Sequence, residues 1–230
     1  MPAARTQNTP AAARVTKSRL SEKAYERILE MLFDRQIPAG AFVSQNQLVA
    51  LVGIPIAPLR DALKVLEVEG ILTVYPGSGI QFVKPGFELT RSTYQYRGIL
   101  ERAAISVYAE VADESELAEL ERRHLAVIAE VERHGLADQT RAEIDALETA
   151  LHSAIIGSLD NPLIETSYKR IRKYLRLIRL ERRTSSAMAL KSLHEHMRVI
   201  SACKARDPEV AAAALRAHFD AALQRALGLY

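Results

Sequence analysis

Two residues of complementary chemistry share one helical stripe in the segment EIDALETALHSAI. Glu148 and His152 are four residues apart, so on an α-helix they project from the same face. The neighbouring positions on that face are apolar, and a carboxylate or an imidazole buried among them needs a partner or a metal ion, because burying it unpaired is costly. The pair is therefore a candidate binding site on a core-facing helix.

A second pair, of two histidines, is placed symmetrically about a predicted turn. Asp207 followed by Pro208 is typical of a helix N-cap with proline at the first helical position, so one helix should end and another begin there. His196 lies eleven residues before Asp207 and His218 eleven residues after it, which at about 1.5 Å of rise per residue puts each roughly 16 Å from the turn. If the two helices form an antiparallel hairpin, the imidazoles lie at the same level; two unrelated surface histidines are the alternative.

Together the two pairs offer one carboxylate and three imidazoles. Such a donor set is suited to Zn, Ni, Mn or Fe(II). Asp145 lies one turn before Glu148 on nearly the same face and could replace it or support it. From the residues alone, buried histidines held by hydrogen bonds remain an alternative to a metal site. The other histidines are predicted to lie at the surface: His124, His134 and His194.

The composition is that of an ordinary soluble protein. The chain has 230 residues, of which 48% are hydrophobic and 26% charged, enough for one large domain or two small ones. No apolar run reaches the length of about 18 to 20 residues that crosses a bilayer, and no hydrophobic signal core is present. We therefore expect a cytoplasmic protein. The single cysteine, Cys203, has no CxxC partner and is predicted to be a small core residue.

Positive charge is concentrated in two segments, although the formal net charge is only +3. Residues 1–20 carry arginine and lysine without any acidic residue, which predicts a disordered basic arm; the composition would also fit an organellar transit peptide. Residues 168–183, YKRIRKYLRLIRLERR, form a second basic cluster within an apolar helical period. A solvated helix face is the usual explanation for such a cluster.

Residues 21–83 have the element order of a winged helix-turn-helix domain. An amphipathic period predicts a first helix over residues 21–33, Ser44 and Gln47 form a capping-box pattern that opens a second, and Pro58 starts a third. The runs ILTVY and IQFV then flank PGSG, which predicts a hairpin. In such a domain the third helix enters the major groove of DNA and the hairpin lies against the phosphates or the minor groove. A generic small α+β domain is the alternative, but the basic residues favour nucleic acid.

The segment KPGFEL, residues 84–89, is typical of a linker, and beyond it the pattern becomes entirely helical. Residues 90–230 show repeated helical periods, several of them preceded by acidic or hydroxyl residues suited to N-capping. The expected fold class is therefore mainly α, an N-terminal winged helix-turn-helix plus a C-terminal all-α helical bundle. The expected helix starts are near Thr90, Asp113, Asp138, Asn161, Ser185 and Asp207.

Motifs in both halves resemble one family of bacterial transcription regulators. IPIAPLRDALKVLEVEGIL followed by GSGIQFV is similar to the DNA-binding domain of the GntR family. Residues 94–218 resemble the FCD effector domain of its FadR subfamily, since YRGILERAA, LHSAI, DNPLI, EHMRVISA and RAHF occur in the expected order. The resemblance covers residues 21–220 and implies an FCD-like effector-binding and dimerisation domain over residues 90–230.

The resemblance also implies a divalent metal cofactor, Zn, Ni or Mn. The family's ligands are an aspartate, a histidine four residues later and two further histidines, which fall on Glu148, His152, His196 and His218. Glutamate in place of aspartate is a departure. Its side chain is one methylene longer, so it can still ligate, with a changed metal position or affinity.

FCD regulators are generally homodimers that bind a small carboxylate metabolite in the bundle, often through the metal. Arg97 occupies the place of the arginine in the family's first effector helix and is the candidate for holding the ligand carboxylate in a bidentate pair. Arg172 is a second candidate, for which an exposed arginine on a basic helix is the simpler interpretation. The implied mechanism is linkage: the ligand orders the bundle and, through residues 84–89, changes the affinity for a two-fold operator.

The predicted recognition helix departs from the family pattern at two positions. The late arginine is present as Arg60, whereas Ile56 and Ala57 stand in place of the earlier arginine and threonine. An arginine contact to guanine or phosphate is therefore missing, and other polar residues should replace it. The candidate DNA contacts are Gln45, Gln47, Arg60, Lys64 and Ser78.

The sequence thus predicts a DNA-binding transcription regulator, not an enzyme, whose operator affinity responds to a small organic acid bound at a metal site. A metal-dependent hydrolytic enzyme built on the bundle is the alternative, since open positions on a histidine-rich metal can activate water. The chain has neither the paired Glu-x-x-His motifs of di-iron bundles nor an HExxH motif, which disfavours an enzyme. A regulator without a ligand, in which the metal only fixes the fold, is a third hypothesis.

Overall fold

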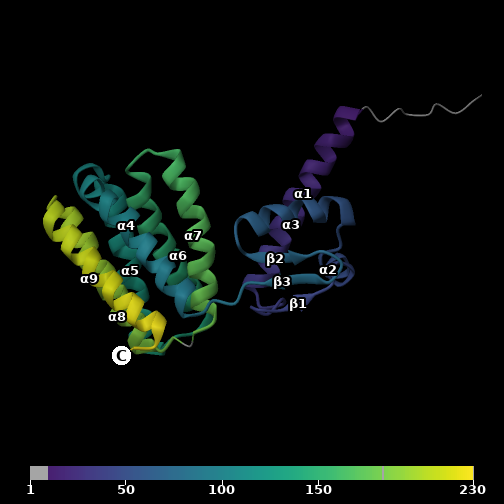
Figure 1. The fold of residues 1–230 in the computed structure, drawn as a ribbon. Coiled ribbons are helices and arrows are strands. Elements are labelled where there is room, and N and C mark those ends of the chain that lie inside the picture. Colours follow the sequence, from purple (N-terminus) through teal and green to yellow (C-terminus); the bar gives the residue numbers. More distant parts are fainter. Residues whose placement is uncertain (1–9, 183, 230) are drawn as a thin grey trace, which may run out of the picture. The chain divides into compact units, whose positions relative to one another are not determined.

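The protein divides into two compact units on either side of the peptide bond between Pro85 and Gly86. The computed structural model describes residues 10–182 and 184–229, and their side chains from residue 18 onward. The first unit is a small α+β domain and the second is entirely helical among these residues (Figure 1). This is the mainly α fold class expected from the sequence.

The first unit has the winged helix-turn-helix order of elements. Its helices pack through apolar faces that include Ile28, Leu59 and Leu66. Strands β2 and β3 form the expected hairpin, and β1, which the sequence patterns did not indicate, pairs with the other edge of β3 in the order β1-β3-β2. The elements are α1 (Pro10–Phe33), β1 (Phe42–Val43), α2 (Gln45–Val52), α3 (Ile56–Val68), β2 (Leu72–Tyr75) and β3 (Gly79–Phe82).

Two expected boundaries in this part of the chain are corrected. Helix α1 begins at Pro10, so residues 10–20, expected to belong to a disordered arm, are helical; residues 1–9 of that arm lie outside the described part of the chain. Helix α3 begins at Ile56, two residues before Pro58, because proline is tolerated anywhere in the first turn, where no N–H partner is required. The capping box between Ser44 and Gln47 is present as predicted.

Six helices follow in the described part of the second unit. The first begins at Phe87, so it takes up the last three residues of the linker expected over 84–89. The other five begin within one residue of the predicted starts. They are α4 (Phe87–Val111), α5 (Glu114–His134), α6 (Asp138–Gly157), α7 (Pro162–Leu180), α8 (Ser186–Lys204) and α9 (Pro208–Leu227).

Side-chain caps fix where several of these helices start. Asp113, Asn161, Ser185 and Asp207 each accept backbone N–H groups of the first turn that follows. The turn between α8 and α9 places Arg206 at a φ of 55°, and the two helices then run back along one another as the predicted hairpin (Figure 1). The position of the Asp207 cap therefore sets the height at which residues of α8 and α9 face each other.

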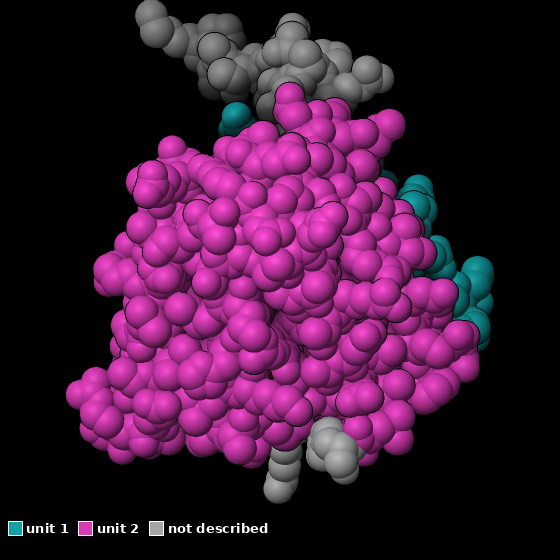
Figure 2. Space-filling view, turned by 90° about the vertical axis from the view of Figure 1, so that its left-hand side faces the viewer, with its two compact units in different colours: residues 1–85 teal, residues 86–230 magenta. Residues whose placement is uncertain are grey.

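Helix α4 is central to the second unit, since it contacts α6, α7, α8 and α9. The core around it is apolar and includes Ile105, Leu151, Val199 and Leu215. Cys203 is buried there as predicted, and burial raises the pKa of its thiol to about 11. On the face shown in Figure 2 the side chains of this unit form a continuous surface. Within the described residues, no helix is both long and apolar enough to cross a bilayer.

Candidate metal centre

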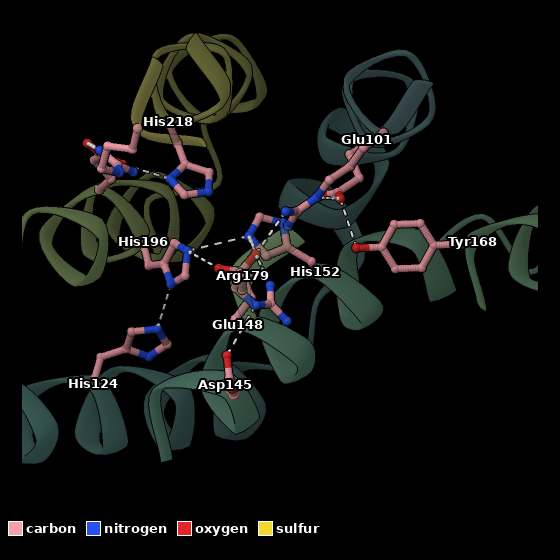
Figure 3. Close-up of polar contacts among 12 residues, drawn as sticks. Glu101, His124, Asp145, Glu148, His152, Tyr168, Arg179, His196 and His218 are labelled. Carbon is pink, nitrogen blue, oxygen red and sulfur yellow. Dashed lines mark hydrogen bonds and ion pairs between the residues drawn. The ribbon is translucent and has the colours of Figure 1, made fainter. Parts of the chain in front are cut away.

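The structure brings together the four residues that the spacing singled out. Helix α6 supplies Glu148 and His152, α8 supplies His196 and α9 supplies His218, and one ligand atom from each lies within 4.8 Å of the others. The three imidazoles point toward one another between these helices (Figure 3). Each histidine is at most 2% exposed, and the Glu148 side chain is 15% exposed. The cluster is therefore nearly sealed, with Glu148 as its most accessible member.

Each of the three imidazoles is held at Nδ1 by a different partner. Glu101 of α4 accepts from His152 Nδ1 at 2.5 Å, and Glu195 of α8 accepts from His218 Nδ1 at 2.9 Å. The third, His196, has its Nδ1 3.2 Å from Nε2 of His124. A neutral imidazole that donates through Nδ1 presents a lone pair at Nε2. The outer contacts therefore orient three lone pairs toward the middle of the cluster.

With these tautomers, the inner Nε2 atoms of the described histidines are acceptors that face one another and the Glu148 carboxylate. Nε2 of His152 lies 3.4 Å from Nε2 of His196, which in turn is 3.3 Å from a Glu148 carboxylate oxygen. Nε2 of His218 is buried and has no hydrogen-bond partner among the described residues. Unpaired acceptors gathered in a buried space are costly unless a cation lies among them.

A divalent metal ion fits this arrangement. Metal–nitrogen bonds of about 2.0 to 2.1 Å at angles near 90 to 110° place two ligand atoms about 2.8 to 3.4 Å apart. The two separations at His196 Nε2, 3.4 Å to His152 and 3.3 Å to Glu148, fall in that range, and all four ligand atoms lie within 4.8 Å of one another. Metal-binding histidines also usually donate a hydrogen bond from the second ring nitrogen to an outer carboxylate. The residues present thus match a metal in donor type, spacing and outer contacts.

The charges around the cluster favour an ionised carboxylate and neutral imidazoles. Arg97, which is 1% exposed, donates to Glu101 at 2.6 Å and to Glu148 at 2.8 Å. Burial alone would raise the pKa of Glu148, but the adjacent Arg97 charge holds it well below its usual range. Burial lowers the pKa of His152, and the Arg97 charge lowers it further. These are the protonation states in which both residue types bind metal ions.

Asp145 is not part of the cluster. Its side chain is 53% exposed and its Oδ1 lies 3.2 Å from Nε of Arg179. Arg179 in turn places Nη1 3.4 Å from Glu148 Oε1. The sequence did not decide which of the two carboxylates faces the histidines, and the structure distinguishes them. Glu148 faces the histidines, whereas Asp145 contacts the arginine beside it.

The arginine of α7 that lies beside Glu148 is Arg179, not Arg172. Arg172 donates to Ser153 Oγ at 3.3 Å and is not among the described partners of Glu148 or the histidines. Arg179 lies two helical turns later on the same face of α7, where it reaches Glu148. The sequence of this basic segment indicates which face of α7 lies toward the cluster. It does not indicate which helical turn of that face contacts Glu148. Arg97 of α4 lies at the cluster, where it donates to Glu101 and Glu148.

His124 was wrongly predicted to lie at the surface; His134 and His194 are exposed as predicted. It is fully buried on α5, its Nδ1 is 2.7 Å from the Leu120 carbonyl oxygen, and burial with the nearby imidazoles lowers its pKa to about 4. A signal was present in the sequence. His124 falls on the helical stripe that also contains Leu117, Leu120 and Val127, all of them buried.

Other members of the network carried weaker signals. Glu101 follows Arg97 by four residues on α4, a spacing that favours an ion pair, and also accepts from Tyr168 at 2.9 Å. Glu195 is paired with both guanidinium nitrogens of Arg225 at 2.6 and 2.8 Å. That pair links α8 to α9 and depends on how the hairpin packs, so no local spacing indicates it.

The first unit presents four of the five predicted DNA contacts around one groove. The groove lies between α3 and the β2–β3 hairpin, and Gln45, Arg60, Lys64 and Ser78 line it. Arg60 donates to Gln45 Oε1 at 3.3 Å, and the Lys64 side chain is 77% exposed. Gln47 is exposed, but its side-chain oxygen accepts from Ser44 in the capping box. Gln47 therefore has a structural role in addition to any contact with DNA.

Comparisons with known proteins agree with this division. Residues 92–221 match the FCD domain and residues 20–82 match the family described as bacterial regulatory proteins, gntR family. The chain is 25% identical over 198 residues to the uncharacterized HTH-type transcriptional regulator YdhC of Bacillus subtilis (strain 168), covering 85% of this chain and 86% of that one. An HTH-type regulator of Streptomyces ambofaciens is 24% identical over 202 residues, covering 86% and 80%.

Solved structures share the same fold. McbR/YncC of E. coli superposes with a TM-score of 0.69 at 19% identity, covering 87% of this chain and 93% of that one. A protein of Rhodococcus sp. RHA1 described as a GntR regulator gives 0.72 at 18% identity, covering 94% and 99%. The family and these relatives are transcriptional regulators, not enzymes. This DNA-binding transcription regulator therefore belongs to the GntR family of bacterial regulatory proteins and carries the family's FCD domain.

Proposed function

We propose that the operator affinity of this regulator is controlled by a small organic acid bound at a divalent metal, Zn, Ni or Mn, in the second unit. Glu148, His152, His196 and His218 would hold the metal. The observation that carries the proposal is the convergence of their inner atoms, including the unpartnered Nε2 of His218, inside a nearly sealed cluster. Apolar side chains would pack in a helical core at lower cost, so the burial of this polar set supports a binding role for it.

The four residues leave room for a ligand in the metal's coordination shell. Three imidazoles and one carboxylate supply four donors, so a five- or six-coordinate ion retains open positions that a carboxylate can fill. Two arginines flank the side of the cluster where Glu148 lies. Arg97 is buried against Glu148, and Arg179 is 31% exposed beside the same carboxylate. Both would attract an organic anion, and Arg179 is the one that solvent reaches.

The regulator would act in the cytoplasm as a homodimer on a two-fold operator. Ligand binding would order the helices around the metal and, through the short connection near Pro85 and Gly86, change the arrangement of the DNA-binding units. The two-part chain and its membership of the family support this linkage. An effect on operator affinity requires the ligand to bind the two states unequally.

A screen tests the proposed control. The Zn-loaded protein is titrated with operator DNA at fixed salt, alone and with each of a panel of small mono-, di- and tricarboxylates. At least one acid should change operator affinity about 5- to 150-fold, the usual range of allosteric coupling. An acid that binds the Zn-loaded protein tightly and leaves operator affinity unaltered would contradict the proposed linkage.

Replacing Lys64 by alanine should weaken binding to all DNA sequences alike. The side chain is exposed beside the groove and lies 3.9 Å from Asp61, so little holds it away from a phosphate. Loss of one phosphate contact reduces the slope of log affinity against log salt by about 1. Arg122→Ala is the matched control, because that arginine is as exposed but lies on α5 of the second unit. If the slope of log affinity against log salt is the same for the native protein and for Lys64→Ala, Lys64 does not contact a phosphate.

A further inference from the structure

We propose that His124 is a positioning residue of the metal centre. It is a buried, neutral imidazole of α5 that holds His196 in the tautomer whose Nε2 lone pair faces the other ligands. The inference rests on the proposed metal site, and it adds α5 to the helices that form that site, since α6, α8 and α9 supply the ligands and α5 supplies none among the described residues. In Figure 3 His124 lies on the outer side of His196, away from His152 and His218.

The direction of the hydrogen bonds follows from one backbone group. The carbonyl oxygen of Leu120 can only accept, so His124 Nδ1, at 2.7 Å from it, must carry the proton. A neutral imidazole protonated at Nδ1 has an acceptor at Nε2. That acceptor lies 3.2 Å from His196 Nδ1, which must therefore donate. With its proton on Nδ1, neutral His196 is left with a lone pair on Nε2, the atom that faces Glu148 and His152.

The surroundings of His124 keep it neutral. It is fully buried, its Nδ1 meets a carbonyl oxygen and its Nε2 meets a ring nitrogen, so its hydrogen-bond partners among the described residues include no carboxylate that would stabilise a second proton. A protonated His124 would donate from both nitrogens, and His196 would then have to carry its proton on Nε2, the wrong atom for ligation. His124 must therefore be neutral for its contact with His196 Nδ1 to leave the lone pair of His196 on Nε2.

His196 differs in this respect from the other two histidines. Carboxylates hold His152 and His218, whereas an uncharged ring holds His196. A carboxylate raises the basicity of the imidazole it holds, so His196 should be the least basic of the three ligands. An uncharged partner also adds no negative charge to a site that is to accept an organic anion. His124 thus orients a ligand without adding a charge.

Two substitutions separate positioning from simple packing. In His124→Gln the side-chain amide oxygen can accept from His196 Nδ1 in place of the ring nitrogen, whereas in His124→Leu a side chain of similar size offers no acceptor. The dissociation constant for Zn is measured by competition with a chromophoric chelator at fixed pH. We expect His124→Leu to weaken binding by about 10- to 100-fold and His124→Gln by less than about threefold.

The matched control is His134→Leu. His134 lies on the same helix but is exposed and contacts Glu130, so this variant should bind Zn as the native protein does. A packing role would give the opposite order, since leucine suits a buried site at least as well as glutamine. Native affinity in His124→Leu, or equal losses in the Leu and Gln variants, would overturn the inference.

A second measurement needs no variant that could fail to fold. Long-range ¹⁵N–¹H correlation spectra of the metal-free native protein report which nitrogen of His196 carries the proton. We expect Nδ1–H for His196 and for His124. Protonation of His196 at Nε2 would overturn the inference even if Zn binds. Absence of Zn binding to the native protein would instead overturn the metal site of the proposed function, and the inference with it.

Discussion

Glu148→Gln is expected to weaken Zn binding by at least about 100-fold, because even the loss of an outer partner of a metal ligand costs about 10- to 100-fold in affinity. Glutamine has nearly the shape of glutamate and can still accept from Arg97, so the variant removes the charge and little else. Glu148 is also the only carboxylate among the four converging residues. The loss should be visible both in the dissociation constant and in the metal content of the purified protein without a histidine tag.

Asp145→Asn is the matched control for this substitution. It makes the same chemical change one helical turn earlier, on a side chain that contacts Arg179 and not the histidines. We expect Zn affinity within about threefold of the native value, the scale of a remote surface charge. A large loss in Asp145→Asn with native binding in Glu148→Gln would reassign the carboxylate ligand to Asp145.

Arg97→Met is expected to lower the free energy of unfolding by about 3 to 5 kcal/mol, the usual cost of removing one partner of a buried ion pair. The substitution leaves Glu101, which is fully buried, without its cation. His152 and Tyr168 would remain as its hydrogen-bond donors. Urea denaturation of the metal-free protein at neutral pH measures the loss without a contribution from metal binding.

Arg91→Met provides the comparison on the same helix. Arg91 pairs with Glu88 three residues away, but both side chains are at least half exposed. Pairs of that kind contribute about 0 to 1 kcal/mol. Losses of similar, small size in the two variants would mean that the Arg97–Glu101 pair stabilises the bundle no more than a surface pair does.

The four converging residues could be found from the sequence because their signals are local. Four-residue spacing places Glu148 and His152 on one face, and the Asp207 cap fixes the level at which His196 and His218 meet. Each of these inferences needs only helix geometry and one turn. The helical starts of the second unit were predictable for the same reason, since their caps are side chains within the first turn.

The outer partners could not be found this way. Glu195 and Arg225 approach each other only because α8 and α9 pack at a particular rotation, which no spacing encodes. Whether Arg172 or Arg179 contacts Glu148 depends on how α7 is positioned along α6. His124 was missed for another reason. Its burial is indicated by the apolar stripe of α5 on which it lies, not by the type of residue.

Adjacent residues of α8 serve different histidines, and this limits how the chain can change in length. His196 turns inward to the cluster while its neighbour Glu195 holds His218 from the other helix. An α-helix rotates about 100° per residue, so one residue added between positions 196 and 218 would turn His218 away from both. A residue added ahead of α8 would leave the hairpin intact. The length of the connection from α8 to α9 thus sets the register of His218 against His196 and Glu195. Homologues that keep the four ligands should keep that length.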